Sequence, residues 1–242
     1  MEYLTLKQIE ELKEFDTPTV LNAIESMAIR KNTEGFCYPG MLLRTPAVEP
    51  MVGYAVTGKI TGTVPPTPGQ MNILFDYYGD VRELKVPGIC VLQDVDETPI
   101  GTFWGEVQAT AFKALGAAGT ITQGGVRDLK EVSSLGFQFF STDIMVARAE
   151  SHLIDRKCQV KICGLTINPG DLIHADLHGV AVIPAEAAPK VAEACRKIVA
   201  AEAVVLKPCR KAIEDGIKPT VDELRQWRSE MNKLRQAVRE QV

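Results

Sequence analysis

The chain has 242 residues, of which 45% are hydrophobic and 24% are charged, and its net charge is −4. No stretch approaches the roughly 20 apolar residues of a membrane-spanning helix, and no basic cluster typical of a nucleic-acid-binding surface occurs. The charged N-terminal segment lacks the apolar core of a secretory signal. We therefore expect a cytoplasmic globular protein whose partners are neither a membrane nor a nucleic acid.

Two predicted helices open the chain. Residues 4–14 place leucine and isoleucine on one helical face. The second helix begins near Asp16-Thr17-Pro18, because Asp16 or Thr17 can cap a helix and proline suits its first position. A strand rich in β-branched residues (51–64), a loop (65–69) and a helix (71–84) follow.

The middle of the chain alternates between strands and helices. The pattern predicts a strand over 88–94, a helix over 106–115, a strand over 120–122, a helix over 126–135 and a strand over 138–141. We interpret Gly124-Gly125 as the turn that leads into the second of these helices. This alternation is typical of βαβ units, so the predicted fold class is α/β with a parallel core.

The segment 158–183 favours antiparallel hairpins, with turns at 168–171 and at His178-Gly179. The histidines of LIHAD and of this turn, His174 and His178, are four residues apart. That spacing brings two ligands onto one face only in a helix. A role within the hairpin therefore fits His174 and His178 better than a zinc site.

Two helices end the chain. The first covers about 187–214, with a kink or break at Pro208 because proline removes a helical hydrogen bond. The last, over 220–242, has apolar residues every three to four positions, which pack either on the same domain or on a neighbouring subunit. We treat residues 1–242 as a single domain in which 217–242 form a C-terminal extension used in packing or oligomerisation.

Two strand-to-helix junctions carry residues suited to chemistry. The first is Gly105-Glu106-Val107-Gln108 and the second is Gly124-Gly125-Val126-Arg127-Asp128. Ligands of open α/β sheets bind beyond the carboxyl ends of the strands, where helix N-termini attract anions. Arg127 can clamp a carboxylate or an enolate oxygen, and Asp128 with Glu106 can hold a hard divalent cation.

A simpler interpretation of the same residues stays open. Acidic side chains are favoured in the first turn of any helix by the helix dipole, and two glycines before a helix can form only a tight turn. An arginine beside the aspartate is unusual for a helix cap alone. Trp104, just before the first junction, either lines the pocket or packs in the core.

The junctions and several other segments resemble one known family. The run GE..A.A.K..G..GT...GGVRD over 105–128, with LGF at 135–137, is similar to the regulator of ribonuclease activity A and to the class II 4-hydroxy-4-methyl-2-oxoglutarate and 4-carboxy-4-hydroxy-2-oxoadipate aldolases. The segments TPTVLNA (17–23), VGYAVT (52–57) and NPGDLIHAD (168–176) also resemble this family. The resemblance spans roughly residues 15–205.

The resemblance implies a swivelling β/β/α-type fold, a homotrimer or hexamer, and a site for Mg²⁺ or Mn²⁺ at the subunit interface. It implies that Asp128 lies against the metal and that Arg127 binds a small 2-oxo acid and steadies its enolate. The backbone of Gly105, Val107 and Gln108 would hold the substrate carboxylate.

Further acidic residues follow from the same resemblance. Glu106 stands where the aldolases carry an acid that organises water around the metal, and Glu202 of a neighbouring subunit is the best match for a further metal-site acid, with Glu193 as the alternative. The chain departs from the family pattern at Gln123 and Gln70, where aspartate is common. These departures bear on the identity of the substrate.

The first functional hypothesis is therefore a metal-dependent lyase. It would cleave or decarboxylate a 2-oxo acid such as oxaloacetate through a pyruvate enolate, whose charge a metal and Arg127 can stabilise. A non-catalytic regulatory protein of the ribonuclease-regulator type is the second hypothesis, because a fold does not determine a function. A family enzyme acting on another small hydroxy acid is the third.

Overall fold

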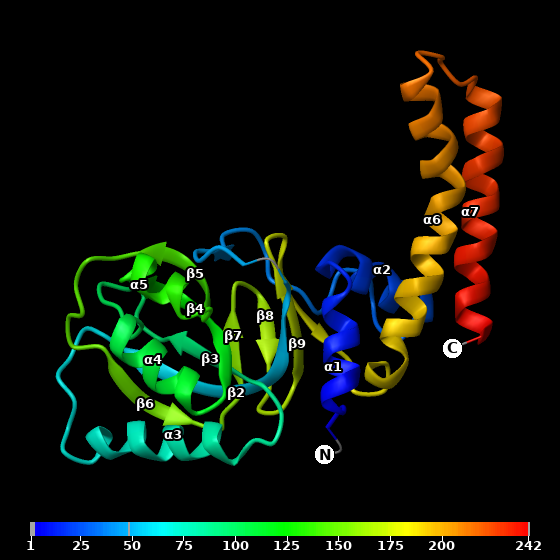
Figure 1. The fold of residues 1–242 in the computed structure, drawn as a ribbon. Helices are drawn as coiled ribbons and strands as arrows, with labels where there is room; N and C mark the ends of the chain where they lie inside the picture. The colour runs from blue at the N-terminus through cyan, green and yellow to red at the C-terminus, as the bar shows by residue number, and fades with distance from the viewer. Residues whose placement is uncertain (1–2, 48, 242) are drawn as a thin grey trace.

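The computed structural model describes residues 3–47 and 49–241. Its main sheet runs in the order β1-β5-β4-β3-β2-β9-β10, and β6 pairs with β2 (Figure 1). β2, β3, β4 and β5 are mutually parallel neighbours, whereas β1, β6, β9 and β10 join antiparallel. The strands of this sheet are β1 (Leu42–Leu43), β2 (Met51–Thr61), β3 (Gly88–Asp94), β4 (Ala117–Val126), β5 (Gln138–Ile144), β6 (His152–Arg156), β9 (Leu172–Asp176) and β10 (Gly179–Ile183).

Three layers form the body of the protein. Helices α3 (Ile73–Glu83), α4 (Glu106–Ala114) and α5 (Leu129–Ser134) cover one face of the sheet, where Tyr77, Phe112 and Val132 join a buried aromatic and aliphatic cluster. The small sheet of β7 (Val160–Ile162) and β8 (Leu165–Ile167) covers the other face. The predicted α/β class, with a parallel core, an antiparallel hairpin and C-terminal helices, is confirmed in this β/β/α arrangement.

Helix α2 (Thr17–Met27) starts where the sequence predicts, whereas α1 (Leu6–Lys13) begins two residues later than the predicted 4–14. A short 3₁₀ turn, Gln70–Asn72, precedes α3. The Thr5 hydroxyl and the Gln8 side chain cap α1 reciprocally, and the Asp16 carboxylate accepts a hydrogen bond from the Thr19 N–H at 2.8 Å. Both helices pack with the hairpin β9–β10 in a second apolar cluster.

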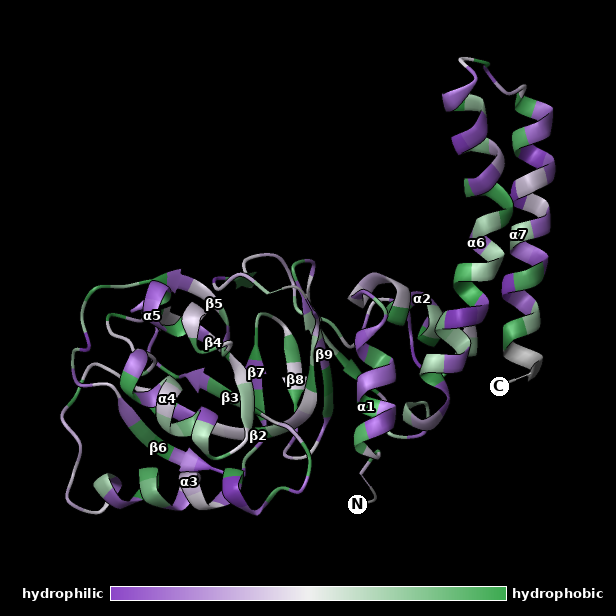
Figure 2. Ribbon diagram, viewed as in Figure 1, coloured by the Kyte–Doolittle hydropathy of each residue, from purple (hydrophilic) through white to green (hydrophobic). Residues whose placement is uncertain are grey.

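The C-terminal helices α6 (Val191–Glu214) and α7 (Val221–Gln241) form an antiparallel pair that rises away from the sheet (Figure 1). The 3₁₀ turn Ala188–Lys190 leads into α6. The helix continues through Pro208, so of the predicted kink or break, the break does not occur. Hydrophilic and hydrophobic residues alternate along both helices (Figure 2). Met231 of α7 is buried, so part of its apolar stripe packs within the same chain.

Two local predictions are wrong, and one strand was not predicted. β4 extends through Gly124 and Gly125 to Val126, so these glycines belong to a strand and not to a turn. The following helix, α5, therefore starts only at Leu129 and has six residues. Strand β6 was not expected at all; it pairs antiparallel with the distal end of β2. In the part of the chain described, no helix has both the length and the apolar character needed to cross a membrane.

Candidate functional site

The two predicted junctions meet at the carboxyl edge of the parallel strands. Gly105 is the N-cap of α4, and the preceding residue, Trp104, forms an isolated parallel bridge with Val126 at the end of β4. Arg127 and Asp128 follow Val126 directly. The structure thus brings together all the predicted site residues of the segment 105–128.

Asp128 joins the end of β4 to the start of α4. Its carboxylate accepts a hydrogen bond from the backbone N–H of Glu106 at 2.9 Å, and the Arg127 Nε lies 3.8 Å from the same oxygen. Asp128 has a φ of 57°, a left-handed conformation that aspartate tolerates better than most residues. A Cβ on Gly105 would lie 2.4 Å from this carboxylate, so only glycine leaves room for it.

Arg127 is held by its backbone and leaves much of its guanidinium open. Its N–H donates to the Trp104 carbonyl at 3.1 Å, and Nη1 reaches the Val146 carbonyl at 3.5 Å. The side chain is 38% exposed. A fixed stem with free guanidinium N–H groups suits a ligand that brings its own oxygens.

The first turn of α4 offers backbone donors to a ligand. Asp128 takes the Glu106 N–H, whereas the Val107 and Gln108 N–H groups find no acceptor among the residues described. The Val107 side chain is 80% exposed, and the Gln108 side chain accepts a hydrogen bond from the Tyr78 hydroxyl at 2.7 Å. At the first junction, the backbone donors left for an anion are therefore the N–H groups of Val107 and Gln108.

The second junction lacks the helix start that the sequence predicted beside its two glycines. α5 is too short for a developed dipole, and it begins at Leu129 rather than beside the glycines. Gly124 and Gly125 instead leave space for other side chains, because added Cβ atoms there would lie 2.9 Å from Asp94 Oδ2 and 2.5 Å from Met145.

The donor set at this edge fits a largely hydrated divalent ion. No cluster of three or more histidine, cysteine or acidic side chains that could enclose a metal occurs in residues 3–47 and 49–241. Mg²⁺, however, commonly binds through one or two carboxylates together with water and substrate oxygens. Asp128 and the exposed Glu106 beside it can supply these one or two carboxylates.

Glu202 lies apart from this edge within one chain. Its carboxylate pairs with Arg235 of α7 at 2.8 Å and accepts a longer hydrogen bond from Asn22 at 3.3 Å. α6, which carries Glu202, lies on the opposite side of the body from α4 and α5 (Figure 1). Glu193 is exposed and pairs with Lys197 at 2.8 Å.

Two aspartates at the same edge, Asp94 and Asp96, were not predicted from the sequence. Asp94 ends β3 and is only 2% exposed; burial raises its pKa to about 6. For Asp96, burial acts to raise the pKa, but hydrogen bonds from Thr61, Gly62 and Thr63 outweigh it and lower the pKa. The signal available in the sequence was a pair of acids at and just beyond the end of a buried strand.

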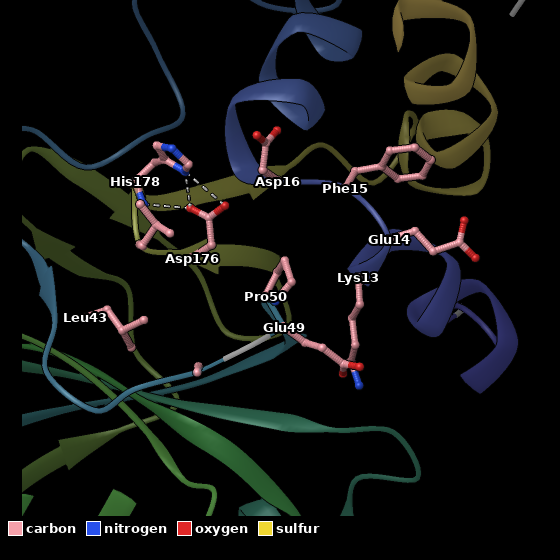
Figure 3. Close-up of a pocket in the computed structure, with 11 residues that line it drawn as sticks. Lys13, Glu14, Phe15, Asp16, Leu43, Glu49, Pro50, Asp176 and His178 are labelled. Carbon is pink, nitrogen blue, oxygen red and sulfur yellow. Dashed lines mark hydrogen bonds and ion pairs between the residues drawn. The ribbon is translucent and has the colours of Figure 1, made fainter. Parts of the chain in front are cut away.

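The histidines lie at a different place. His174 is buried and bonds through its ring to the Thr17 hydroxyl at 2.9 Å and to the Leu12 carbonyl at 3.1 Å. His178 contacts the Asp176 carboxylate at 3.2 Å beside a cavity of about 370 Å³ (Figure 3). These contacts agree with the predicted role in the β9–β10 hairpin. Trp104 is fully buried, so its core interpretation is confirmed.

The fold and the junctions define an α/β protein with a candidate ligand site at the carboxyl edge of parallel strands. The chain belongs to the RraA-like family, described as Aldolase/RraA, whose model matches residues 17–182. This match confirms the resemblance found in the sequence.

Individual relatives agree with the family. A putative 4-hydroxy-4-methyl-2-oxoglutarate aldolase of Halalkalibacterium halodurans is 30% identical over 107 residues, which is 44% of this chain and 47% of that protein. The chain spans less than half the length of the curated relatives it matches.

Solved structures extend the likeness over most of the chain. An uncharacterized protein from Pseudomonas syringae pv. tomato is similar with a TM-score of 0.69 and 25% identity, over 95% of this chain and 97% of that one. Streptomyces coelicolor RraAS2, described as an unusual member of the RNase ES inhibitor RraA family, shares the fold with a TM-score of 0.63 and 20% identity, over 80% and 92% of the two chains.

Proposed function

We propose that the protein is a divalent-metal-dependent lyase that cleaves or decarboxylates a small 2-oxo acid through a pyruvate enolate. The observation that supports it most is the convergence of Arg127, Asp128 and the free N–H groups of Val107 and Gln108 at one edge of the sheet. A 2-oxo acid presents a carboxylate and a keto oxygen on adjacent carbons, which matches a pair of backbone donors beside a guanidinium.

Each residue has a distinct part in this proposal. The Val107 and Gln108 N–H groups bind the substrate carboxylate at the helix start, and Gly105 keeps the backbone open to it. Arg127 donates to the keto oxygen and stabilises the negative charge that grows there as the C–C bond breaks.

Asp128, with Glu106 beside it, would hold Mg²⁺ or Mn²⁺. When bound, such an ion supplies Lewis acidity toward the keto oxygen. Glu106, exposed at the rim, accepts the proton of the substrate hydroxyl directly or through a water. The Asp128 carboxylate meanwhile stays fixed by the Glu106 N–H.

The exposure of this edge supports an oligomer. Val107, in the first turn of α4, is 80% exposed, and Val146, whose carbonyl the Arg127 Nη1 reaches, is 93% exposed. Enolate chemistry favours a site from which bulk water is excluded. A single chain leaves the candidate site exposed to water. A homotrimer or hexamer in which a neighbour covers the edge, and brings Glu202 or Glu193 to it, is therefore part of the proposal.

The test is pyruvate release by the purified chain. We expect release from 4-hydroxy-4-methyl-2-oxoglutarate, 4-carboxy-4-hydroxy-2-oxoadipate or oxaloacetate in the presence of Mg²⁺ or Mn²⁺, and its loss with EDTA. Arg127→Ala should lower the rate by about 10²–10³-fold. Arg225→Ala, which removes the same charge from exposed α7, is the control. Equal inertness of wild type and both variants on all three acids would exclude the lyase.

A regulatory protein is the second candidate. The exposed Val107 and Val146 side chains favour it, because apolar residues around a polar centre are also typical of a protein-binding surface. Such a protein would release no pyruvate from any substrate and would bind a ribonuclease through this edge. Activity on another small hydroxy acid alone would instead indicate the third candidate, a family enzyme with a different substrate.

A further inference from the structure

Asp94 is a buried carboxyl group to which the proposed reaction assigns no role. Its Oδ1 accepts a hydrogen bond from the Asp96 N–H at 3.0 Å, and among the described residues no further donor to this buried carboxyl group is found. A buried charge is costly unless its oxygens are paired with donors. The ionised form of Asp94 is therefore short of donors.

Other aspartates of the chain show what a structural carboxylate looks like here. Asp96 accepts hydrogen bonds from the Thr61 and Thr63 hydroxyls and from the Gly62 N–H. Asp176, also buried, accepts from the Thr17 N–H and from both the backbone and the ring of His178. Asp94 lacks such a set, so fold stability alone does not account for an acid at this position.

Unpartnered donors lie on the loop that follows Asp94. The Trp104 Nε1 and the Thr102 hydroxyl are buried and have no hydrogen-bond partner in the part of the chain described. Buried polar groups are normally paired, so each such exception calls for an explanation.

Asp94 and Trp104 follow one another along the same edge of β4. Leu92 of β3 pairs with Thr122 of β4, and Trp104 pairs with Val126 four residues further along β4. Asp94 is two residues beyond Leu92, and it lies beside Gly124, because a Cβ there would be 2.9 Å from its Oδ2. Gly124 stands one two-residue step before Val126, the bridge partner of Trp104. Such a step along a strand is about 7 Å. Leu92 and Trp104 share one core cluster, so Asp94 faces the same side.

Trp104 in turn supports both halves of the candidate site. Its carbonyl accepts the hydrogen bond of the Arg127 N–H at 3.1 Å, and the next residue is Gly105, which lies under the Asp128 carboxylate. A shift of Trp104 therefore displaces Arg127 and the start of α4 together.

We propose that Asp94 is a positioning residue of this site, whose ionised carboxylate draws the unpartnered indole N–H of Trp104 toward it and thereby fixes Arg127 and Gly105. Only the effect on catalysis rests on the proposed function; the coupling of Asp94 to Trp104 does not. Ionisation supplies the charge that recruits a donor. Protonation removes that charge and releases Trp104.

The coupling responds to pH in a defined direction. Burial raises the pKa of Asp94 to about 6, the Asp96 N–H lowers it, and the Asp96 charge raises it again. Asp96 is the charged group that faces Asp94 from its own loop. The flanking strands present uncharged groups, Ile60 and Gly124, and His152 of β6 pairs one position further along β2. The site is therefore ordered above this pKa and loosens below it.

Indole N–H resonances of the full chain test the coupling directly. The chain has two tryptophans, so a ¹H–¹⁵N spectrum shows two indole cross-peaks, which Trp227→Phe assigns. We expect the Trp104 peak to move with a midpoint near pH 6, while the Trp227 peak on α7 serves as the control in the same spectrum. Asp94→Asn should abolish the movement, and Asp96→Asn should keep it.

Activity profiles provide the second arm. If the lyase is active, the low-pH limb of kcat near pH 6 should disappear in Asp94→Asn and in Trp104→Phe, with KM changed less than twofold. A Trp104 peak that does not titrate, or that still titrates in Asp94→Asn, would overturn the inference. If the wild-type protein releases no pyruvate but its Trp104 peak still titrates, the proposed function is excluded and the coupling of Asp94 to Trp104 stands.

Discussion

The Asp128 carboxylate and the Glu106 N–H, 22 residues apart in the chain, form a hydrogen bond of 2.9 Å. This bond fastens the end of β4 to the start of α4, so the two junctions behave as one unit. It also occupies one of the free N–H groups of α4 with a residue of the protein itself. The backbone N–H groups of Val107 and Gln108, beside Arg127, remain free to bind a ligand.

Gly105→Ala should damage this unit without damaging the fold around it. The new Cβ would lie 2.4 Å from Asp128 Oδ2 and 3.2 Å from Arg127 Nε, so both functional side chains must move. We expect a loss of kcat of about 10²-fold and a stability loss of about 1 kcal/mol, because alanine is a poor N-cap. Pyruvate release and thermal unfolding measure the two effects. Gly69→Ala, where the Cβ would meet nothing within 4 Å, should change neither.

Replacing Asp128 separates its role in the fold from its role toward a metal. The asparagine of an Asp128→Asn variant keeps an oxygen acceptor for the Glu106 N–H and tolerates the left-handed backbone. This variant should therefore unfold within about 1 kcal/mol of wild type, yet bind Mn²⁺ at least about tenfold more weakly. Asp128→Ala should lose both, with about 2 kcal/mol of stability. Calorimetric titration with Mn²⁺ would contradict a metal role if Asp128→Asn bound the ion as well as wild type does.

Glu202 and Arg235 can be exchanged to test the neighbouring-subunit acid. Within one chain these residues form an ion pair of 2.8 Å. Glu202→Arg combined with Arg235→Glu restores the pair with reversed polarity, so most of the stability lost in either single variant should return. Activity should not return if Glu202 serves the site of a neighbour. Recovery of activity along with stability would assign Glu202 a purely structural role.

Asp94→Asn should stabilise the protein at neutral and alkaline pH. The folded-state pKa of Asp94 is raised from 3.8 to about 6 by burial, so ionisation costs the native state stability. This cost is absent below about pH 3.8, grows between that value and about 6, and is complete above. Urea unfolding at pH 8 should favour the asparagine variant by about 1–2 kcal/mol, and the difference should vanish at pH 4 or below. A variant that is less stable at pH 8 would contradict the buried, donor-poor environment.

The sequence predicted the first junction well because its signals are local. Glycine before an acidic first turn marks the start of α4, and the alternation of strands and helices fixes the order β3-α4-β4-α5-β5. Gly124 and Gly125 misled the prediction because the reason for them is not local. Their missing side chains make room for Asp94 and Met145, which lie on the neighbouring strand β3 and just beyond β5. Nothing near residue 124 in the sequence indicates that.

The same limit explains what was overlooked. Strand β6 depends on a partner, β2, whose paired residues lie about ninety positions earlier. The importance of Asp94 emerges only when its neighbours are known, because a carboxyl group's pKa depends on what surrounds it. The pairing of Glu202 with Arg235 likewise joins two helices across a turn.

The order of the strands has a consequence for how the chain folds. β3 pairs with β4 about thirty residues further along the chain and β4 pairs with β5 about nineteen residues further, whereas β2 closes onto β9 through pairs such as Tyr54 with Leu172. Contacts between distant segments form late, because a long loop must first be closed. The segment from Gly88 to Ile144, which contains Arg127 and Asp128, is thus assembled from near neighbours. During refolding, the candidate site can form before the N-terminal helices find the hairpin that anchors them.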